Sequence, residues 1–261
     1  MTALAVYLLT GAVAGVLGGL LGIGGGLVIV PALAWLLPGL GVGPEAAMHV
    51  AVGTSLATIV FTNSASAASH HRRGAVRWVE AARLIAGIVP GALLGAWLAG
   101  ELSSAVLERV FASFAALMGL YLLFGHRPSP HRGLPGPPVL AGAGVIIGGV
   151  SSLVGIGGGS MTAPLLMWCN VRAQEAVATA SACGLPLALG GALGFVATGW
   201  NATALPAHAL GYVYLPALAG IAVASSLCAP LGARLAHALP AAVLKRVFGA
   251  ALLLIGALMV R

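Results

Sequence analysis

Eight apolar runs, separated by short polar segments, occupy most of the 261-residue chain. They cover residues 3–37, 45–69, 78–98, 103–124, 138–170, 174–198, 209–233 and 240–260. A helix needs about 20 apolar residues to cross the hydrocarbon core of a bilayer. Six runs fit one helix each, whereas the first and the fifth are too long for a single span. The pattern predicts an all-α polytopic membrane protein with about eight hydrophobic segments.

Each of the two long runs contains a glycine-rich break near its middle. Gly22-Ile23-Gly24-Gly25-Gly26 returns as Gly155-Ile156-Gly157-Gly158-Gly159, 133 positions later, and a proline follows each copy at the same distance. Each glycine costs a helix roughly 1 kcal/mol relative to alanine. Irregular backbone survives at membrane depth only where protein or a water-filled cavity surrounds it. Each long run therefore predicts a helix, a turn and a shorter helix.

The two halves of the chain repeat each other beyond the glycine breaks. Val106-Leu107-Glu108-Arg109-Val110-Phe111 matches Val243-Leu244-Lys245-Arg246-Val247-Phe248, 137 positions later. A polar stretch rich in proline, glycine, histidine and arginine separates the halves. We expect a first transmembrane repeat over 1–125, a cytoplasmic linker over 126–137 and a second transmembrane repeat over 138–261.

Composition and charge indicate how the repeats are oriented. The chain is 60% hydrophobic and 7% charged, far below the roughly 25% charge of soluble domains. Cytoplasmic loops of membrane proteins collect Lys and Arg. If all eight runs cross the membrane, seven of the twelve Lys and Arg residues lie inside; if the glycine-broken runs are re-entrant, ten do. We therefore expect inverted repeats, and leave open whether the broken segments are re-entrant or fully spanning.

Several function classes find no support in the composition. Aspartate is absent, and the three cysteines form no Cys-x-x-Cys pair. We therefore expect neither an enzyme nor a metal or cofactor site. The net charge of +7 comes mostly from arginine clusters between apolar runs, so we expect a lipid bilayer around the chain and no nucleic-acid partner.

The glycine breaks are the candidate substrate site. A helix N-terminus carries a partial positive charge, and we expect helices to restart from Leu27 and from Ser160, with Ser160 as the N-cap. Two inverted copies would bring both N-termini to one site near the midplane. The candidate substrate-binding residues are Gly24, Gly25, Gly26, Gly157, Gly158, Gly159, Ser160, Thr54, Ser55, Ser181 and Asn63. The alternatives are close helix packing for the glycines and bonds to their own helix for the hydroxyls.

Two acidic residues recur in the two halves, each at the start of a predicted span. Glu45 and Glu175 are either carboxylates that stabilise a helix N-terminus near the interface or proton-coupling groups of a carrier. The sequence supports both interpretations.

The paired G-x-G-G-G breaks with their downstream prolines, the stretch Val52-Gly53-Thr54-Ser55 and the duplicated apolar halves resemble the TauE/SafE family of sulfite exporters over essentially the whole chain. Thr179-Ala180-Ser181 in the second half lacks the glycine of Gly53-Thr54-Ser55. The resemblance implies export or uptake of sulfite, sulfoacetate or other sulfur anions.

We therefore expect a multi-pass carrier of small sulfur-containing anions in the cell inner membrane, working by alternating access around the paired breaks. The alternatives are an anion channel and a carrier for a non-sulfur organic anion. The sequence leaves open the substrate, the transport direction, the coupling ion and whether the protein forms a homo-oligomer.

Overall fold

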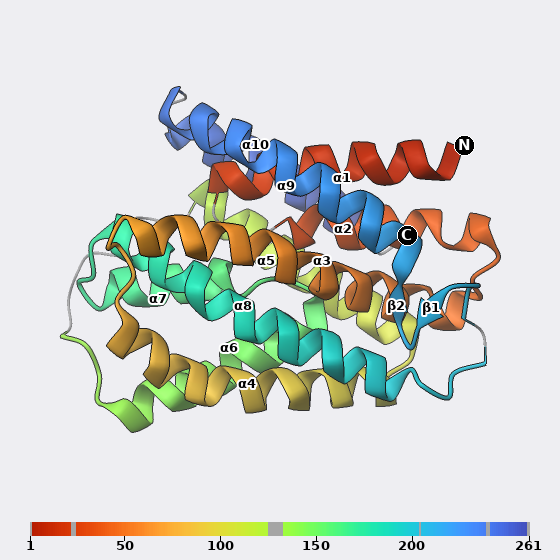
Figure 1. The fold of residues 1–261 in the computed structure, drawn as a ribbon, viewed down its shortest axis with the longest axis horizontal. Helices are drawn as coiled ribbons and strands as arrows, with labels where there is room; N and C mark the ends of the chain where they lie inside the picture. Colours follow the sequence, from red (N-terminus) through yellow and green to blue (C-terminus); the bar gives the residue numbers. More distant parts are fainter. Residues whose placement is uncertain (1, 22–24, 125–132, 204, 239–240, 260–261) are drawn as a thin grey trace.

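The computed structural model describes residues 2–21, 25–124, 133–203, 205–238 and 241–259, and within them the chain is almost entirely helical. The elements, drawn in Figure 1, are α1 (Thr2–Leu21), α2 (Gly26–Leu36), the short 3-10 helix η1 (Pro38–Leu40), α3 (Pro44–Arg72), α4 (Trp78–Glu101), α5 (Ser104–Phe124), α6 (Pro137–Val154), α7 (Gly159–Trp168), α8 (Ala173–Thr198), β1 (Ala209–Leu210), β2 (Val213–Tyr214), α9 (Leu215–Ala238) and α10 (Ala241–Met259).

This is an all-α membrane architecture. Five of the described helices, α3, α4, α5, α6 and α8, are long and apolar enough to cross a bilayer. The run 3–37 contains α1 and α2, and the run 138–170 contains α6 and α7. The run 209–233 differs from its prediction, because it begins with the antiparallel hairpin β1–β2, in which Leu210 pairs with Val213.

The predicted starts of the two short helices are wrong by one residue. α2 begins at Gly26 and α7 at Gly159, so the N-cap of α7 is Gly158 and not Ser160. Gly158 has φ +70°, a conformation that glycine adopts without the penalty a Cβ brings. Ser160 therefore lies inside the first turn of α7, where its N–H has no acceptor within the helix.

The two most extensive helix contacts each join a helix of the first half to a helix of the second half: α4 packs with α6, and α1 packs with α9. α3 and α8 also pack against each other. Glycines bring α4 and α6 close together. A Cβ at Gly87 or Gly91 of α4 would collide with backbone carbonyls of α6. Close packing through small residues, the alternative considered for the glycine breaks, is thus the role of these α4 glycines.

The molecule has two chemically different ends, which we name by their residues. The tyrosine end holds Tyr7, Tyr212 and Tyr214, with the hairpin at the right of Figure 1. The arginine end holds Arg72, Arg73, Arg77 and Arg172.

Contacts at these ends place the starts of α3 and α8 at opposite ends of the molecule. His49, near the start of α3, bonds through Nε2 to the carbonyl of Ala99, at the end of α4, at 2.9 Å. In contrast, Glu175, at the start of α8, faces Arg77, at the start of α4, with 3.8 Å between Oε2 and Nη1. α4 therefore ends beside the start of α3 and begins beside the start of α8.

Two matching loops lie at the two ends, 137 positions apart in the sequence. Gly74-Ala75-Val76-Arg77 leads into α4, and Gly211-Tyr212-Val213-Tyr214 leads into α9. Both glycines have positive φ, +65° and +53°, and both valines are buried. The last N–H of each loop donates to a buried threonine: Arg77 to Thr179 Oγ1 at 3.0 Å and Tyr214 to Thr54 Oγ1 at 2.9 Å.

Candidate functional site

The start of α2 meets the second glycine break in the interior of the protein. A Cβ at Gly26, the first residue of α2, would collide with the carbonyl oxygen of Gly155 and lie 3.1 Å from Ile156 Cα. A Cβ at Gly25 would lie 2.7 Å from Ala14 Cβ on α1. Gly24 lies outside the described residues. The start of α2 is therefore in backbone contact with the break between α6 and α7.

The break between α6 and α7 leaves backbone donors inside the protein. Residues 155–159 are buried. The N–H groups of Met161 and Thr162 donate to the carbonyl of Gly158 at 3.1 and 2.9 Å. Among the bonds of the described residues, none uses the N–H groups of residues 157–160. The N-terminus of α7, with its partial positive charge, therefore presents N–H groups that have no acceptor among the described residues.

Two of the predicted residues on α3 lie beside this break. Ser55 Oγ donates to the carbonyl of Gly155 at 2.8 Å, in a buried bond. Asn63 is 8% exposed, and a Cβ at Gly184 of α8 would collide with its amide nitrogen and lie 2.5 Å from the carbonyl oxygen of Gly157. α3 therefore contacts the break at two points, with Ser55 at Gly155 and Asn63 near Gly157.

Four hydroxyls around the break are buried without a hydrogen-bond partner among the described residues. They belong to Ser151, Ser152, Ser160 and Thr162. A buried hydroxyl without a partner costs free energy, typically about 1–3 kcal/mol, so those of the four that face the start of α7 are candidates to bond a ligand. Ser160 was predicted for the site.

Sequence reasoning missed the other three hydroxyls, although a signal was present. Ser151 and Ser152 directly precede the break, where the first repeat has Gly18 and Gly19. Helical periodicity does not tell which of two adjacent serines faces the break.

Two predicted hydroxyls lie away from the break. Thr54 accepts the N–H of Tyr214 at the tyrosine end. Ser181 donates to the carbonyl of Val177 at 3.0 Å, in the half of α8 nearer the arginine end, and receives a bond from Ser66 at 3.4 Å. Ser181 thus bonds to its own helix, as the alternative interpretation of the hydroxyls expects.

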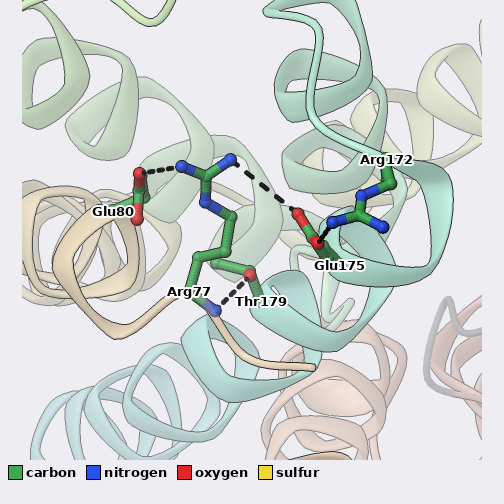
Figure 2. Close-up of polar contacts among 5 residues, drawn as sticks. All are labelled: Arg77, Glu80, Arg172, Glu175 and Thr179. Carbon is green, nitrogen blue, oxygen red and sulfur yellow. Dashed lines mark hydrogen bonds and ion pairs between the residues drawn. The ribbon is translucent and has the colours of Figure 1, made fainter. Parts of the chain in front are cut away.

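The two candidate coupling residues lie at opposite ends. Glu45 is exposed at the start of α3. Glu175 is ion-paired: its Oε1 is 3.1 Å from Arg172, and its Oε2 is 3.8 Å from Arg77, which also binds Glu80 at 2.7 Å (Figure 2). Neither carboxylate has a described contact with the break, and their role in coupling stays a prediction.

At the arginine end, one face of α3 lines an open cavity of about 390 Å³. Its lining residues are Ala65, Ala68, Ser69, Arg72 and Arg73. These small, hydroxyl and cationic side chains are exposed, although most lie in an apolar run of spanning length. A surface of this kind suits water and anions better than lipid.

At the tyrosine end, Tyr212 is wedged among α3, α8 and the hairpin. Its ring stacks on His49 at 4.8 Å between centroids and meets Phe195 edge-on at 6.3 Å. A Cβ at Gly53 would lie 2.6 Å from the Tyr212 carbonyl, and one at Gly199 would lie 2.7 Å from its ring. Burial raises the pKa of Tyr212, so its phenol stays neutral. Aromatic packing fills this end of the molecule.

Comparison with known proteins identifies the family of this chain. The family described as "Sulfite exporter TauE/SafE" matches residues 7–259. This protein belongs to the TauE/SafE family. The match confirms the resemblance drawn from the paired glycine breaks and the duplicated halves.

Relatives of this TauE/SafE chain carry transporter names. A "Probable membrane transporter protein" of Haemophilus influenzae is 35% identical, over 97% of this chain and 97% of its own length. "Probable membrane transporter protein MJ0441" of Methanocaldococcus jannaschii is 28% identical, over 87% of this chain and 82% of its own. No solved structure matches the chain at a significant level.

Membership of the TauE/SafE family, with the five spanning-length helices, identifies a multi-pass membrane transporter. The names of the family and its relatives indicate transport rather than catalysis. Among the described residues, no group of three or more His, Cys, Asp or Glu side chains is arranged to hold a metal ion.

Proposed function

We propose that this protein is a secondary carrier of small anions in the cell inner membrane, with sulfite, organosulfonates and related sulfur oxyanions as its substrate class. One observation carries the proposal. The N-terminus of α7 begins inside the protein, with the buried, unpartnered hydroxyl of Ser160 in its first turn. Free N–H groups, a positive helix end and a hydroxyl together suit the oxygens of an anion. The name of the family supports sulfite as the substrate.

The mechanism that we propose is alternating access in two inverted repeats, 1–125 and 138–261, joined by the linker 126–137. Three observations support it: α3 and α8 begin at opposite ends, α4 and α6 pair as α9 and α1 do, and the matched loops bond to Thr179 and Thr54. Contact between Gly26 and Gly155 would put both breaks at one central site.

We infer that the conformation described is open at the arginine end and closed at the tyrosine end. The cavity along α3 is open at the arginine end, and Tyr212 packs closely against Gly53 and Gly199 at the tyrosine end. We assign the arginine end to the cytoplasm, because cytoplasmic loops collect Lys and Arg. The tyrosine end would open, and the α3 cavity close, in the opposite state.

Thiol labelling tests the inverted arrangement. Ala75→Cys and Leu210→Cys, in a background without the three native cysteines, place one thiol in the α3–α4 loop and one on β1. We expect an impermeant maleimide to label position 210 from outside intact cells and position 75 only after permeabilisation. Labelling of both positions from the same side would overturn the inversion and leave the substrate proposal standing.

Transport in proteoliposomes tests the function. We expect saturable uptake of sulfite that shows counterflow, because a carrier exchanges substrate across the membrane. Ser160→Ala should weaken anion binding on the order of tenfold in a folded protein, the effect of one hydrogen bond to a charged group. Fast uptake without saturation or counterflow would favour a channel, and uptake of carboxylates alone would favour a carrier for non-sulfur organic anions.

A further inference from the structure

We propose that the substrate's anionic group is bound by neutral donors alone at the start of α7, with Ser151 as an additional ligand. From this we infer that the carrier accepts singly charged oxyanions, including sulfite in its hydrogensulfite form, and discriminates against doubly charged ones. The inference rests on the function proposed above and adds to it a residue and a charge class.

Ser151 is buried and directed toward the break. It is fully buried on the last turn of α6, and its hydroxyl has no partner among the described residues. Its Oγ lies 3.7 Å from the point that a Cβ would occupy if Gly158, the N-cap of α7, carried a side chain. Ser160, 5% exposed and also unpartnered, lies two residues beyond that cap. Two hydroxyls from different helices therefore flank one helix N-terminus.

Ser152 provides an internal contrast. It is as buried as Ser151 and equally unpartnered. Its Oγ, however, lies 3.0 Å from the position of a Cβ on Gly191, at a contact between α6 and α8 that also includes Leu56. Ser152 therefore faces α8 and not the N-cap of α7, which makes it a matched control.

The hydroxyls belong to the second break alone. The positions that correspond in the first repeat to Ser151, Ser152, Ser160 and Thr162, 133 residues earlier, are Gly18, Gly19, Leu27 and Ile29. None of the four carries a hydroxyl. The duplicated architecture thus provides one site with side-chain donors for one anionic group, rather than two equivalent sites.

The surroundings of this site limit the charge that it holds. The side chains nearest to Cβ positions on Gly155 and Gly158, and the hydroxyl that bonds Gly155, are all neutral; they belong to Val30, Val52, Ile147, Leu187, Ser151 and Ser55. The described arginines of the arginine end pair with Glu80 and Glu175 or line the α3 cavity. A helix N-terminus supplies about half a positive charge, and an uncompensated buried charge is costly. One negative charge is therefore matched far better than two.

The experiment compares two probes with different charges on the purified full-length protein. Methanesulfonate carries one negative charge and sulfate carries two, and both present sulfur-bound oxygens. We expect methanesulfonate to raise the apparent melting temperature at a concentration at least about tenfold lower than sulfate does. Equal or tighter binding of sulfate would overturn the inferred charge class.

Two variants test the added ligand. Ser151→Ala should raise the dissociation constant for methanesulfonate on the order of tenfold, the loss of one hydrogen bond to an anion. Ser152→Ala should leave that constant within about twofold. Without ligand, neither variant should melt below the wild type, because each removes a buried hydroxyl that bonds nothing among the described residues.

The outcomes separate this inference from the proposed function. If the wild type binds methanesulfonate and Ser151→Ala binds it equally well, Ser151 is not a ligand and the carrier proposal stands. If Ser151→Ala lowers the melting temperature of the free protein and keeps the full ligand shift, the role of Ser151 is structural. If the wild type neither binds nor transports any sulfur anion, the proposed function fails, and this inference fails with it.

Discussion

The loops 74–77 and 211–214 have the same backbone design but different side chains. Each begins with a glycine at positive φ, buries a valine and ends by donating an N–H to a threonine on the central helix of the other half. Ala75 and Arg77 of the first loop stand where the second has Tyr212 and Tyr214. The backbone is therefore set by glycine and threonine, and the remaining side chains give each end its chemistry.

The difference extends to the second halves of α3 and α8, the helices that come before the two loops in the chain. The second half of α3 reads Phe61-Thr62-Asn63-Ser64-Ala65-Ser66-Ala67-Ala68-Ser69, and part of it lines the open cavity. The second half of α8 reads Leu187-Ala188-Leu189-Gly190-Gly191-Ala192-Leu193-Gly194-Phe195 and ends under Tyr212. The second half of α3 thus presents polar groups toward the arginine end, whereas the second half of α8 presents mainly apolar groups toward the tyrosine end.

The largest difference between the loops should appear when their first glycines become alanine. Gly211→Ala directs a methyl group into the carbonyl of Val196, whereas Gly74→Ala meets nothing within 4 Å. Both introduce strain at positive φ, worth about 1 kcal/mol, and overpacking adds a further 1–3 kcal/mol or so at Gly211. Thermal denaturation in detergent measures both. Equal destabilisation by the two variants would show that the loops are packed alike.

The next largest loss of stability should follow truncation of the Tyr212 side chain. Tyr212→Ala removes a ring that packs on His49 and Phe195, and we expect a loss of about 2–3 kcal/mol, less than for a fully buried aromatic. It should also make a cysteine placed at Phe195 react with an impermeant thiol reagent from the tyrosine end. Tyr212→Phe, which keeps the ring, is the control and should keep that cysteine protected. Protection in both variants would mean that Tyr212 does not seal this end.

The two threonines should give smaller and nearly equal effects. Thr54→Val and Thr179→Val keep the shape of a fully buried side chain and remove the acceptor of one backbone N–H. Each should cost about 1–3 kcal/mol, the penalty for a donor left without a partner. Denaturation of the two variants in parallel measures this. A large effect at one threonine and none at the other would contradict the equivalence of the two junctions.

The sequence predicted the architecture better than the site. Apolar runs predict helices of spanning length because the length and order of these runs lie in the sequence itself, as do the 133- and 137-residue offsets between its two halves. The start of α7 was misplaced because an N-cap serine and an N-cap glycine are both common, and only the positive φ of Gly158 decides between them. Ser151 escaped notice because its direction toward Gly158 depends on how α6 is rotated.

The predicted role of Ser181 shows the same limit. In the sequence, Thr54-Ser55 and Thr179-Ala180-Ser181 look like two versions of one polar motif. In the structure Thr54 and Thr179 are equivalent, whereas Ser55 holds Gly155 and Ser181 bonds within its own helix. Tertiary packing decides which hydroxyl of a motif reaches a break. That packing cannot be deduced from a single sequence.

The smallest expected effect concerns the ion pairs that, among the described residues, lie at the arginine end. Glu175→Gln removes contacts to Arg172 and Arg77, whose side chains are 86% and 37% exposed. Exposed pairs contribute little, so we expect a loss below about 1 kcal/mol, with a weaker dependence of stability on salt than in the wild type. Because Glu175 lies at the surface and away from the break, we also expect sulfite transport to continue. Loss of transport at unchanged melting temperature would instead favour proton coupling through Glu175, and Glu80→Gln, which removes another partner of Arg77, controls for a general loss of charge at this end.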